Sequence, residues 1–457
     1  MTLEVIVLAA GKGTRMHSVL PKVLHKLADR ALLEPALDTV RQLRPARIHV
    51  VYGYGGERVR ERLADADDVN WVEQAQQLGT GHAVRQALPD LSSDALTLVV
   101  YGDVPLIRAD TLRAVLGQCT GQGPALLTAE LKDPTGYGRI LRDGTGAVTA
   151  IVEEADASEA ERQITEINTG FIACPADGLH VWLDAIDTSN RQEEYYLTDV
   201  IECAVQTGAT VATVRCADPD EIAGVNSQAE LAKSERCFQA RQADALMEAG
   251  LGLRDPARFD LRGDLKFGKD CVFDINVVIA GEVTLGDQVS VGPNCQIIDS
   301  EIGNGVEIRA NSVIEGVRIA DHCSVGPFAR LRPGTVLDSG ARVGNFVETK
   351  NTTLGEDSKA NHLAYVGDAT VGHRVNIGAG VITCNYDGAN KHPTVIGDDA
   401  FIGSNSALVA PVTVGKGATV GAGSAVTRDV PEGQLALTRA EQQVRTDWQR
   451  PKKEKKN

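Results

Sequence analysis

An aliphatic or aromatic residue recurs at every sixth position in the C-terminal half of the sequence. One unbroken run consists of Leu261, Phe267, Phe273, Ile279, Leu285, Val291 and Ile297. In an α-helix, six residues at about 100° each turn the chain by about 600°, so these side chains would not share one face. The period does not match an ordinary strand either. It is the period of hexapeptide β-helices, in which short strands wind around one core.

The last run of this repeat is the most regular. It consists of Ile396, Ile402, Leu408, Val414, Val420 and Val426, and the residues four positions later are small: Ala400, Ser406, Val412, Ala418, Ser424 and Val430. This pattern suits a triangular coil with room for one large residue per side. Without the interruption at 384–394, residues 261–430 would form about nine coils stacked at ~4.8 Å. We predict a left-handed parallel β-helix; a β-sandwich with accidental spacing is the alternative.

The first 226 residues follow a different pattern. Apolar runs at 5–9, 48–52 and 96–101 end in Gly or Asp and are separated by longer polar stretches with helical character. This alternation predicts a Rossmann-like α/β sheet with mostly parallel strands, in which ligands bind where the strands end. Ser227 and Glu230 have capping-box spacing and would open a helix that Gly250 stops. We therefore predict domains at 1–226 and 251–457, joined by a linker helix at 227–250.

Charge and cysteine content narrow the functional class. The net charge of −16 argues against a general nucleic-acid surface. The chain has nine cysteines, an odd number, and no two of them form a C-x-x-C motif. This favours free thiols in a reducing cytosol. The apolar start at 5–10 is too short for a signal segment, and no later stretch could span a bilayer. We expect a cytoplasmic protein without nucleic-acid or membrane partners.

A glycine-rich loop follows the first predicted strand. It reads Leu8-Ala9-Ala10-Gly11-Lys12-Gly13-Thr14-Arg15-Met16, and Pro21-Lys22 follows. Backbone amides in such a loop can cradle a nucleotide. The string is neither a Walker A loop nor G-x-G-x-x-G, which makes a dinucleotide fold less favoured. It resembles the signature of nucleotidyltransferases that make nucleoside-diphosphate sugars; an ordinary glycine turn is the alternative.

Further segments extend this resemblance along the chain. They are Gln74 with Leu78-Gly79-Thr80-Gly81, Tyr101-Gly102-Asp103-Val104-Pro105, Gly136-Tyr137-Gly138-Arg139, Glu153, Glu166-Ile167-Asn168-Thr169-Gly170 and Gly224-Val225-Asn226. Together with the hexapeptide repeats, they resemble the family of bifunctional bacterial N-acetylglucosamine-1-phosphate uridylyltransferases and glucosamine-1-phosphate N-acetyltransferases. The resemblance runs from about residue 3 to residue 448.

The resemblance implies a uridylyltransferase site in the first domain. UTP and the UDP-sugar would be bound by Leu8, Ala9, Ala10, Gly11, Lys22, Gln74, Gly79, Thr80, Tyr101, Gly102, Asp103, Gly138, Glu153, Asn168 and Asn226. Of these, Gly138, Glu153 and Asn168 would hold the sugar. Arg15 and Lys22 would act on the phosphates. Asp103 and Asn226 match the family's Mg²⁺ ligands, and a carboxylate with an amide oxygen suits this hard cation. The sugar phosphate would attack the α-phosphorus of UTP in line.

The interruption of the repeat marks a second candidate site. A loop that breaks a regular coil is a common functional position, and polar residues cluster around this one. The resemblance implies that His362 is the general base on the substrate amine. It also implies that glucosamine 1-phosphate is bound by Arg332, Lys350, Tyr365 and Asn376, and the co-substrate acetyl-CoA by Ala379, Asn385, Tyr386, Ser404, Ala422 and Arg439. Two positions differ from the family's pattern. Asn361 precedes His362 where glycine is expected, and Lys391-His392-Pro393 changes the end of the loop.

The family resemblance also implies assembly and pathway. A homotrimer is expected, with acetyltransferase clefts between neighbouring β-helices. The N-acetylglucosamine 1-phosphate made there would react at the first site to give UDP-N-acetylglucosamine for cell-wall precursors such as peptidoglycan and lipopolysaccharide. One alternative is a monofunctional nucleotide-sugar pyrophosphorylase with a structural or regulatory β-helix. Another is a scaffold or exchange factor, although Lys22 and Asp103 are retained.

Overall fold

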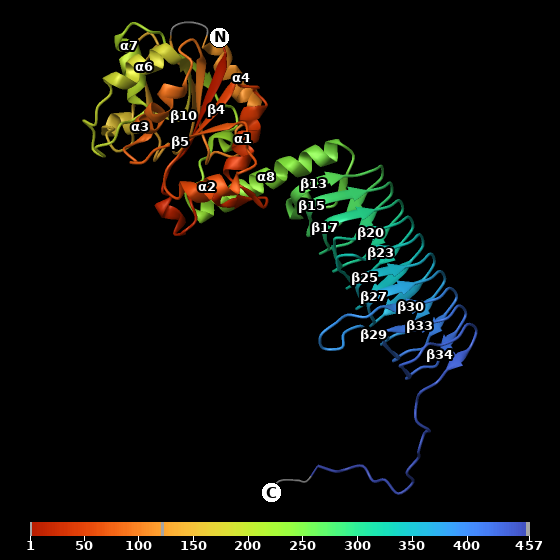
Figure 1. Ribbon diagram of the computed structural model, residues 1–457. Coiled ribbons are helices and arrows are strands. Elements are labelled where there is room, and N and C mark those ends of the chain that lie inside the picture. The colour runs from red at the N-terminus through yellow and green to blue at the C-terminus, as the bar shows by residue number, and fades with distance from the viewer. Residues whose placement is uncertain (1, 120–122, 454–457) are drawn as a thin grey trace. The chain divides into compact units, whose positions relative to one another are not determined.

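The chain divides into two units, Met1–Phe238 and Gln239–Asn457. The computed structural model describes residues 2–119 and 123–453 (Figure 1). Among these residues, no helix combines the length and the apolar character needed to cross a bilayer. The division falls within helix α8 (Gln228–Glu248), inside the segment that the sequence predicts as a linker.

Unit 1 is built on one mixed sheet. Its strand order is β11-β7-β10-β6-β1-β4-β5, with the β8-β9 hairpin paired to β10. The strands are β1 (Leu3–Ala9), β4 (Arg47–Tyr52), β5 (Val69–Glu73), β6 (Leu96–Tyr101), β7 (Ala125–Glu130), β8 (Arg139–Arg142), β9 (Val148–Val152), β10 (Glu166–Pro175) and β11 (Ala212–Arg215); β2 (Lys26–Leu27) and β3 (Arg30–Ala31) form a separate hairpin. Strand β10 runs antiparallel to β6 and β7, whereas β1 is parallel to β4 and β6. The predicted mostly parallel α/β sheet is confirmed.

Helices pack on both faces of this sheet. They are α1 (Leu33–Arg41), α2 (Gly56–Arg62), α3 (Thr80–Ala87), α4 (Ala109–Gln118), α5 (Glu159–Arg162), α6 (Ala176–Ala185) and α7 (Asp199–Gln206). Side chains of β1 alternate between two apolar clusters: Val5 and Val7 belong to one, Ile6 and Leu8 to the other. Because β1 is buried on both faces, its residues from Val5 to Ala9 form a continuous apolar run. Strand β1 therefore fixes the start of the glycine-rich loop.

Unit 2 is the expected hexapeptide β-helix. One face is an 11-stranded sheet of β12 (Gly252–Leu253), β14 (Val272–Phe273), β16 (Ser290–Val291), β18 (Glu307–Ile308), β21 (Ser324–Val325), β24 (Arg342–Asn345), β26 (Lys359–His362), β28 (Asn376–Ile377), β31 (Phe401–Ile402), β34 (Thr419–Val420) and β36 (Leu435–Ala436). All neighbouring strands in this sheet are parallel. The coil thus extends beyond 261–430 at both ends; its left-handed sense stays a prediction.

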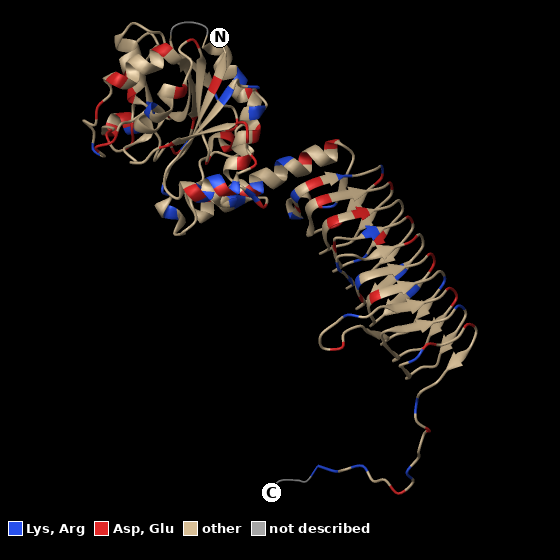
Figure 2. Cartoon of the chain, viewed as in Figure 1, with Lys and Arg blue, Asp and Glu red and all other residues tan. Residues whose placement is uncertain are grey.

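A 14-stranded sheet forms the rest of the coil wall. Its strands are β13 (Phe259–Lys266), β15 (Val277–Leu285), β17 (Gln296–Ile302), β19 (Val313–Glu315), β20 (Arg318–Ile319), β22 (Arg330–Leu331), β23 (Val336–Leu337), β25 (Glu348–Leu354), β27 (Tyr365–Val371), β29 (Ile382–Cys384), β30 (Thr394–Ile396), β32 (Ala407–Val409), β33 (Val412–Val414) and β35 (Ala425–Val426). Acidic and basic residues are interspersed along these coils (Figure 2). Some form ion pairs between successive coils, such as Arg318 with Glu301 at 3.0 Å.

The six-residue repeat fills the interior of the coil as predicted. All six anchors of the last run and all six small residues four positions later are buried. In the first run, Phe267 is the exception because it is only half-buried, although it packs against the same core. Partners on successive coils are 18 residues apart at Phe259 and Val277, but 17 apart at Gln296 and Val313. The five-residue steps in the sequence therefore shorten individual coils without breaking the stack.

Helix α8 begins with the capping residues that the sequence indicates. The Glu230 backbone N–H donates to Ser227 Oγ at 3.3 Å, while the Glu230 carboxylate accepts from the backbone N–H of Asn226 at 2.7 Å. The return bond of a capping box would go to Ser227, so here it is displaced by one residue. Gly250, with φ of 106°, follows the end of the helix. The cap fixes the backbone of Asn226, a predicted metal ligand.

The interior of unit 2 generates a stability prediction. Leu408 is fully buried on β32, whereas its neighbour Val409 is 39% exposed. Replacing Leu408 with Ala should lower the free energy of unfolding of this unit by about 2–5 kcal/mol, because the cavity cannot fully collapse. Val409→Ala is the matched control and should change it by less than about 0.5 kcal/mol. Denaturant unfolding followed by circular dichroism measures both, and equal effects would contradict an inward-facing Leu408.

Candidate active sites

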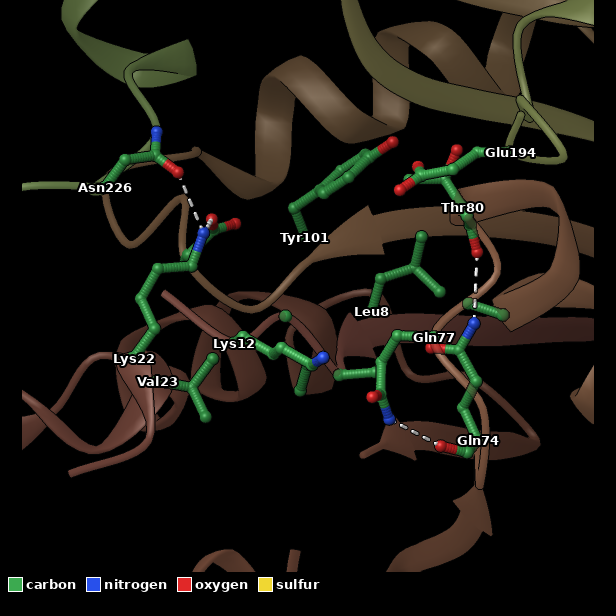
Figure 3. Close-up of a pocket in the computed structure, with 16 residues that line it drawn as sticks. Leu8, Lys12, Lys22, Val23, Gln74, Gln77, Thr80, Tyr101, Glu194 and Asn226 are labelled. Carbon is green, nitrogen blue, oxygen red and sulfur yellow. Dashed lines mark hydrogen bonds and ion pairs between the residues drawn. The ribbon is translucent and has the colours of Figure 1, made fainter. Parts of the chain in front are cut away.

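A cavity of about 500 Å³ lies in unit 1 where β1 and β6 end (Figure 3). It is lined by Leu8, Ala9, Ala10, Gly11, Lys12, Lys22, Val23, Gln74, Gln77, Gly79, Thr80, Ala83, Tyr101, Asp103, Glu194 and Asn226. The loops after the two strands are held together because the Gly102 N–H donates to the Leu8 carbonyl at 2.9 Å. The carboxyl ends of parallel strands thus form the site, as expected for this sheet type.

Lys22 joins the two predicted metal ligands at one side of the cavity. Its ammonium forms an ion pair with the Asp103 carboxylate and donates to Asn226 Oδ1 at 2.9 Å. Asp103 and Asn226 are also connected through the backbone, because the Val225 N–H donates to the Asp103 carbonyl at 2.9 Å. Two oxygen atoms of the type that Mg²⁺ prefers therefore face one cation position. This donor set fits a divalent ion that keeps most of its water ligands.

The opposite side of the cavity contains the predicted uridine-binding residues. Gln74 Nε2 donates to the Gly79 carbonyl at 3.0 Å. Gly79 has φ of 109°, and a Cβ there would lie 2.5 Å from the Tyr195 carbonyl oxygen, so the position requires glycine. Thr80 Oγ1 accepts from the Leu197 N–H at 3.0 Å. The glycine turn is therefore held against a distant segment of the chain.

The predicted sugar-binding residues form a group beside the cavity. The Asn168 N–H donates to the Gly138 carbonyl at 2.8 Å, and the register of the β8-β9 hairpin brings Glu153 to the same place. Burial raises the pKa of Glu153, partly offset by a 2.9 Å hydrogen bond from Thr198 Oγ1. Burial and the carboxylates of Glu153 and Asp103 raise the pKa of Tyr101, which lies between this group and the cavity.

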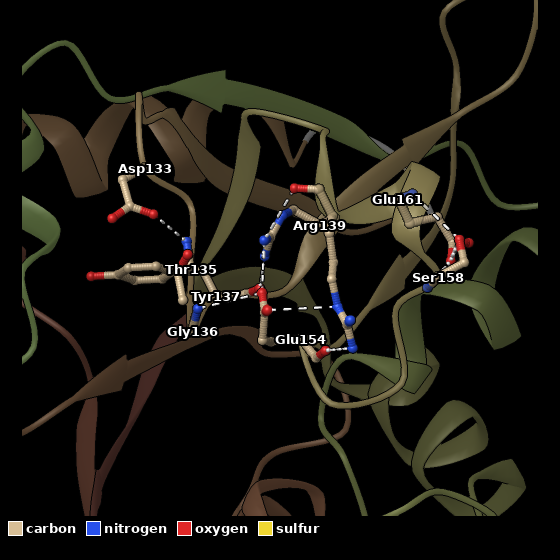
Figure 4. Close-up of polar contacts among 9 residues, drawn as sticks. Asp133, Thr135, Gly136, Tyr137, Arg139, Glu154, Ser158 and Glu161 are labelled. Atoms are coloured by element: carbon tan, nitrogen blue, oxygen red, sulfur yellow. Dashed lines mark hydrogen bonds and ion pairs between the residues drawn. The ribbon is translucent and has the colours of Figure 1, made fainter.

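A buried arginine supports the turn that carries Gly138 (Figure 4). The Arg139 side chain is 1% exposed, and its Nη2 donates to Glu154 Oε2 at 2.7 Å. Its Nη1 also donates to the Tyr137 carbonyl. Because Glu154 follows Glu153 in sequence, this pair joins the two turns on which Gly138 and Glu153 lie. Burying a charge costs free energy unless it is paired, and here the pairing rigidifies the edge of the site.

The structure gathers most, but not all, of the predicted first-site residues. Gly102, Gly138, Glu153 and Asn168 lie next to the cavity without lining it in the described part of the chain. Arg15 is exposed on a 3₁₀ turn (Thr14–Met16) and is likewise outside that lining. Lys12, Gln77 and Glu194 line the cavity but were not predicted. Lys12 lies in the glycine-rich loop, and Gln77 lies between Gln74 and the Leu78–Gly81 motif. No local sequence pattern marks Glu194.

In unit 2, His362 lies at the end of β26, directly before the corner that leads to β27. Its Nδ1 is 2.8 Å from Oδ1 of Asn345, which is its register partner one coil earlier. An amide oxygen can only accept, so in the neutral imidazole Nδ1 carries the hydrogen and Nε2 has the lone pair. A cavity of about 500 Å³ beside His362 is also lined by Arg342 and Asn361. Sequence reasoning missed Asn345, although its position 17 residues before His362 is one coil spacing.

The predicted phosphate-binding cations lie on the next face of the coil. Arg332 Nη1 pairs with Glu348 Oε1 at 2.8 Å. Lys350 lies beside Lys391 of the interrupting loop, and the second ammonium lowers the pKa of Lys350. The structure therefore adds Lys391 to the candidate cations. Tyr365 stands on the neighbouring coil, opposite Glu348 in register.

The interrupting loop is held by side-chain contacts at its base. Asn385 is buried there, and its Nδ2 donates to Asp368 Oδ2 at 2.5 Å. The reason is that Asp368, one coil earlier, supplies an acceptor. The Asp387 carboxylate accepts hydrogen bonds from the backbone N–H groups of Ala389 and Asn390. It also pairs with His392 Nε2 at 2.7 Å. These bonds lower the pKa of Asp387.

The predicted acetyl-CoA residues form a column on consecutive coils. The Asn405 N–H donates to the Ala379 carbonyl at 2.7 Å, and the Gly423 N–H donates to the Ser404 carbonyl at 2.8 Å. Arg439 Nη1 then donates to the Ala422 carbonyl at 3.0 Å. Tyr386 is exposed on the loop, and Asn376 lies on β28. The structure therefore brings Ala379, Ser404, Ala422 and Arg439 onto one edge of the rod.

Comparisons with known proteins cover both units. The model of the MobA-like NTP transferase domain matches residues 5–166, and that of the hexapeptide repeat of succinyl-transferase matches residues 393–428. The chain is 55% identical to the bifunctional protein GlmU of Pseudomonas entomophila and 57% identical to that of Azotobacter vinelandii, over 100% of both chains in each case. A solved nucleotidyl transferase from Methanothermobacter thermautotroptrophicus aligns at a TM-score of 0.38 with 19% identity, covering 52% of this chain and 97% of its own.

The carboxylates behind Glu153 generate a pH prediction. Burial and the neighbours Glu153, Glu202, Asp187 and Asp156 raise the pKa of Asp199 from 3.8 to about 6. A raised folded-state pKa means that Asp199 favours folding below its unfolded value and that this contribution is lost as the pH rises through about 6. Asp199→Asn imitates the protonated form. It should raise the melting temperature of unit 1 at pH 8 and change it little at pH 4.

The matched control for this pH prediction is Asp177→Asn, in the first turn of α6. Asp199 also lies in a first helical turn, that of α7, where an acidic residue is ordinarily stabilising. Asp177→Asn removes a charge from the equivalent helical position without the carboxylate neighbours of Asp199, so it should not reproduce the increase at pH 8. Scanning calorimetry at both pH values gives the comparison. A gain from Asp199→Asn that is the same at pH 4 and pH 8 would contradict the assigned electrostatic cause.

Proposed function

The chain belongs to the family of bifunctional GlmU proteins and is an acetyltransferase and uridylyltransferase; from this premise we propose that the two sites described above carry the two activities. The single observation that carries this proposal is the identity of 55–57% over the whole of both chains. Because that identity spans unit 2 as well, a pyrophosphorylase with a merely structural β-helix and a non-catalytic scaffold are both disfavoured.

In unit 1 we propose transfer of UMP from UTP to N-acetylglucosamine 1-phosphate. Gln74, Gly79 and Thr80 bind the uridine, while Glu153 and Asn168 orient the sugar. Its phosphate oxygen attacks the α-phosphorus and pyrophosphate leaves in line. The cations of Lys12 and Lys22 offset charge on the phosphates. Mg²⁺ held by Asp103 and Asn226 would supply further charge neutralisation. Positioning and electrostatics account for the rate, so no protein nucleophile is needed.

In unit 2 we propose acetylation of glucosamine 1-phosphate by acetyl-CoA. His362 Nε2 removes a proton from the sugar amine as the amine attacks the thioester carbonyl, and the CoA thiolate leaves. Asn345 orients the imidazole through Nδ1, which keeps Nε2 as the basic atom. Arg332, Lys350 and Lys391 provide positive charge for the sugar phosphate. The column from Ala379 to Arg439 provides the surface for the rest of acetyl-CoA.

We propose that the order of the two reactions places this enzyme before cell-wall precursor synthesis. The product of unit 2 is the sugar phosphate that unit 1 consumes. The nine cysteines, all within the described residues, form no disulfide, which is consistent with the proposed cytoplasmic location. The predicted domain bounds at 226 and 250 remain part of this proposal.

An exposed apolar corner of the β-helix supports the proposed homotrimer. Phe328, Phe346 and Leu363 are 50%, 55% and 61% exposed, and they occupy equivalent corners of successive coils. The rings of Phe328 and Phe346 stack with centroids 5.3 Å apart. All three have positive φ, a conformation that bulky residues adopt rarely. A contiguous apolar patch next to His362 suits packing against a second copy of the chain.

The separation of the two activities is directly testable. His362→Ala should lower CoA release at least about a hundredfold, because the general base is lost, and leave pyrophosphate release from supplied N-acetylglucosamine 1-phosphate intact. Asp103→Ala should do the reverse. The assay supplies glucosamine 1-phosphate, acetyl-CoA, UTP and Mg²⁺ and follows CoA and pyrophosphate separately. Loss of both activities in either folded variant would contradict two autonomous sites.

The trimer proposal predicts a defect at the apolar corner. Phe346→Asp should convert the trimer to monomers and reduce CoA release while pyrophosphate release persists, because a buried carboxylate at the contact is costly. Sedimentation velocity measures the mass. The control, Val181→Asp, changes a residue of unit 1 that is 59% exposed and should leave the mass unchanged. A monomeric wild-type chain, or a trimeric Phe346→Asp variant, would refute the assignment of this surface.

A further inference from the structure

The position between Asp103 and Asn226 is taken by the ammonium of Lys22 (Figure 3). The three residues come from segments far apart in the sequence: Lys22 begins a 3₁₀ turn (Lys22–Leu24), Asp103 follows β6, and Asn226 precedes α8. The side chains of Lys22 and Asp103 are only 13% and 14% exposed. Such burial makes the contact more than a solvated surface pair.

Each member of this trio is positioned by contacts other than the trio itself. Glu230 binds the backbone N–H of Asn226, and the Val225 N–H binds the carbonyl of Asp103. The stem of Lys22 packs on Gly13, whose φ is 60° and where a Cβ would lie 2.7 Å from Lys22 Cβ. The two oxygens are therefore held in place by the fold, and Lys22 reaches them from the 3₁₀ turn that it begins. Its flexible side chain is the one part free to leave.

We infer that Lys22 acts as an internal cation that competes with the divalent metal for the same two oxygens. An ammonium and Mg²⁺ cannot both contact Asp103 and Asn226 Oδ1 at one position, because two cations at hydrogen-bond separation repel strongly in a part-buried site. The metal binds fully only when the ammonium moves away, and the phosphates of the nucleotide are the anions toward which it moves. Metal and nucleotide thus favour each other's binding through one side chain.

This inference rests on the proposed metal ligands, and Mn²⁺ alone tests it without reference to turnover. Lys22→Met removes the competing charge while keeping an unbranched side chain. In the absence of nucleotide, the full-length variant should bind Mn²⁺ at least about tenfold more tightly than the wild type. Free Mn²⁺ is counted by electron paramagnetic resonance during titration. Lys22→Gln gives a second variant if Met perturbs folding, and thermal melting verifies both.

Lys12→Met is the matched control, because Lys12 lines the same cavity and the variant removes the same charge from the glycine-rich loop. It should tighten Mn²⁺ binding clearly less than Lys22→Met does. Equal affinities of the wild type and both Lys22 variants would overturn the inference. An equal gain from Lys12→Met would overturn it as well, since the effect would then be general electrostatics.

A double variant separates failure of the inference from failure of the proposed site. Asp103→Ala in the Lys22→Met background should abolish the tight Mn²⁺ site. If tight binding survives there, the proposed metal ligands are wrong. If Asp103→Ala in the wild-type background removes Mn²⁺ binding but Lys22→Met does not strengthen it, the ligands are supported and the competition is refuted.

Discussion

Register between successive coils is the constraint on which unit 2 depends. Each short strand is too small to be stable by itself, so it pairs with equivalent strands before and after it. Parallel pairing such as Ile377 with Ile402 stacks each anchor on the next and leaves one apolar column inside. The same register places polar residues of distant sequence beside one another outside. His362 meets Asn345 for this reason, and Asn385 meets Asp368.

The repeat made the fold of unit 2 predictable because its period is a direct consequence of coil geometry. The exception at Phe267 arises where the sheet ends: β13 has β15 on one side only in its sheet, so the adjoining residue is less covered. Asn385 shows a different limit. This polar side chain is buried because a partner is available, and the partner depends on the coil register. Period alone does not reveal such pairs.

The site of unit 1 was predictable where local motifs follow strands, as in the loops after β1 and β6. It was not predictable where the fold brings residues from distant parts of the sequence into the site. Glu194 reaches the cavity from a segment without a motif, and Lys22 contacts residues 81 and 204 positions away. The family resemblance assigned Lys22 to the phosphates and Asp103 with Asn226 to a metal. Only the geometry shows that these two assignments share one location and therefore interact.

The two candidate sites handle positive charge in a related way, although their folds are unrelated. Lys22 has an internal anionic partner in Asp103, and Arg332 has one in Glu348. Lys350 differs because its neighbour is the like-charged Lys391. A sugar phosphate placed between these two ammonium groups would relieve their repulsion, whereas at Lys22 a phosphate must replace an existing carboxylate contact. The sugar phosphate in unit 2 therefore gains more from Lys350 and Lys391 than a phosphate in unit 1 gains from Lys22. Lys22 exchanges one anionic partner, the Asp103 carboxylate, for another, the phosphate.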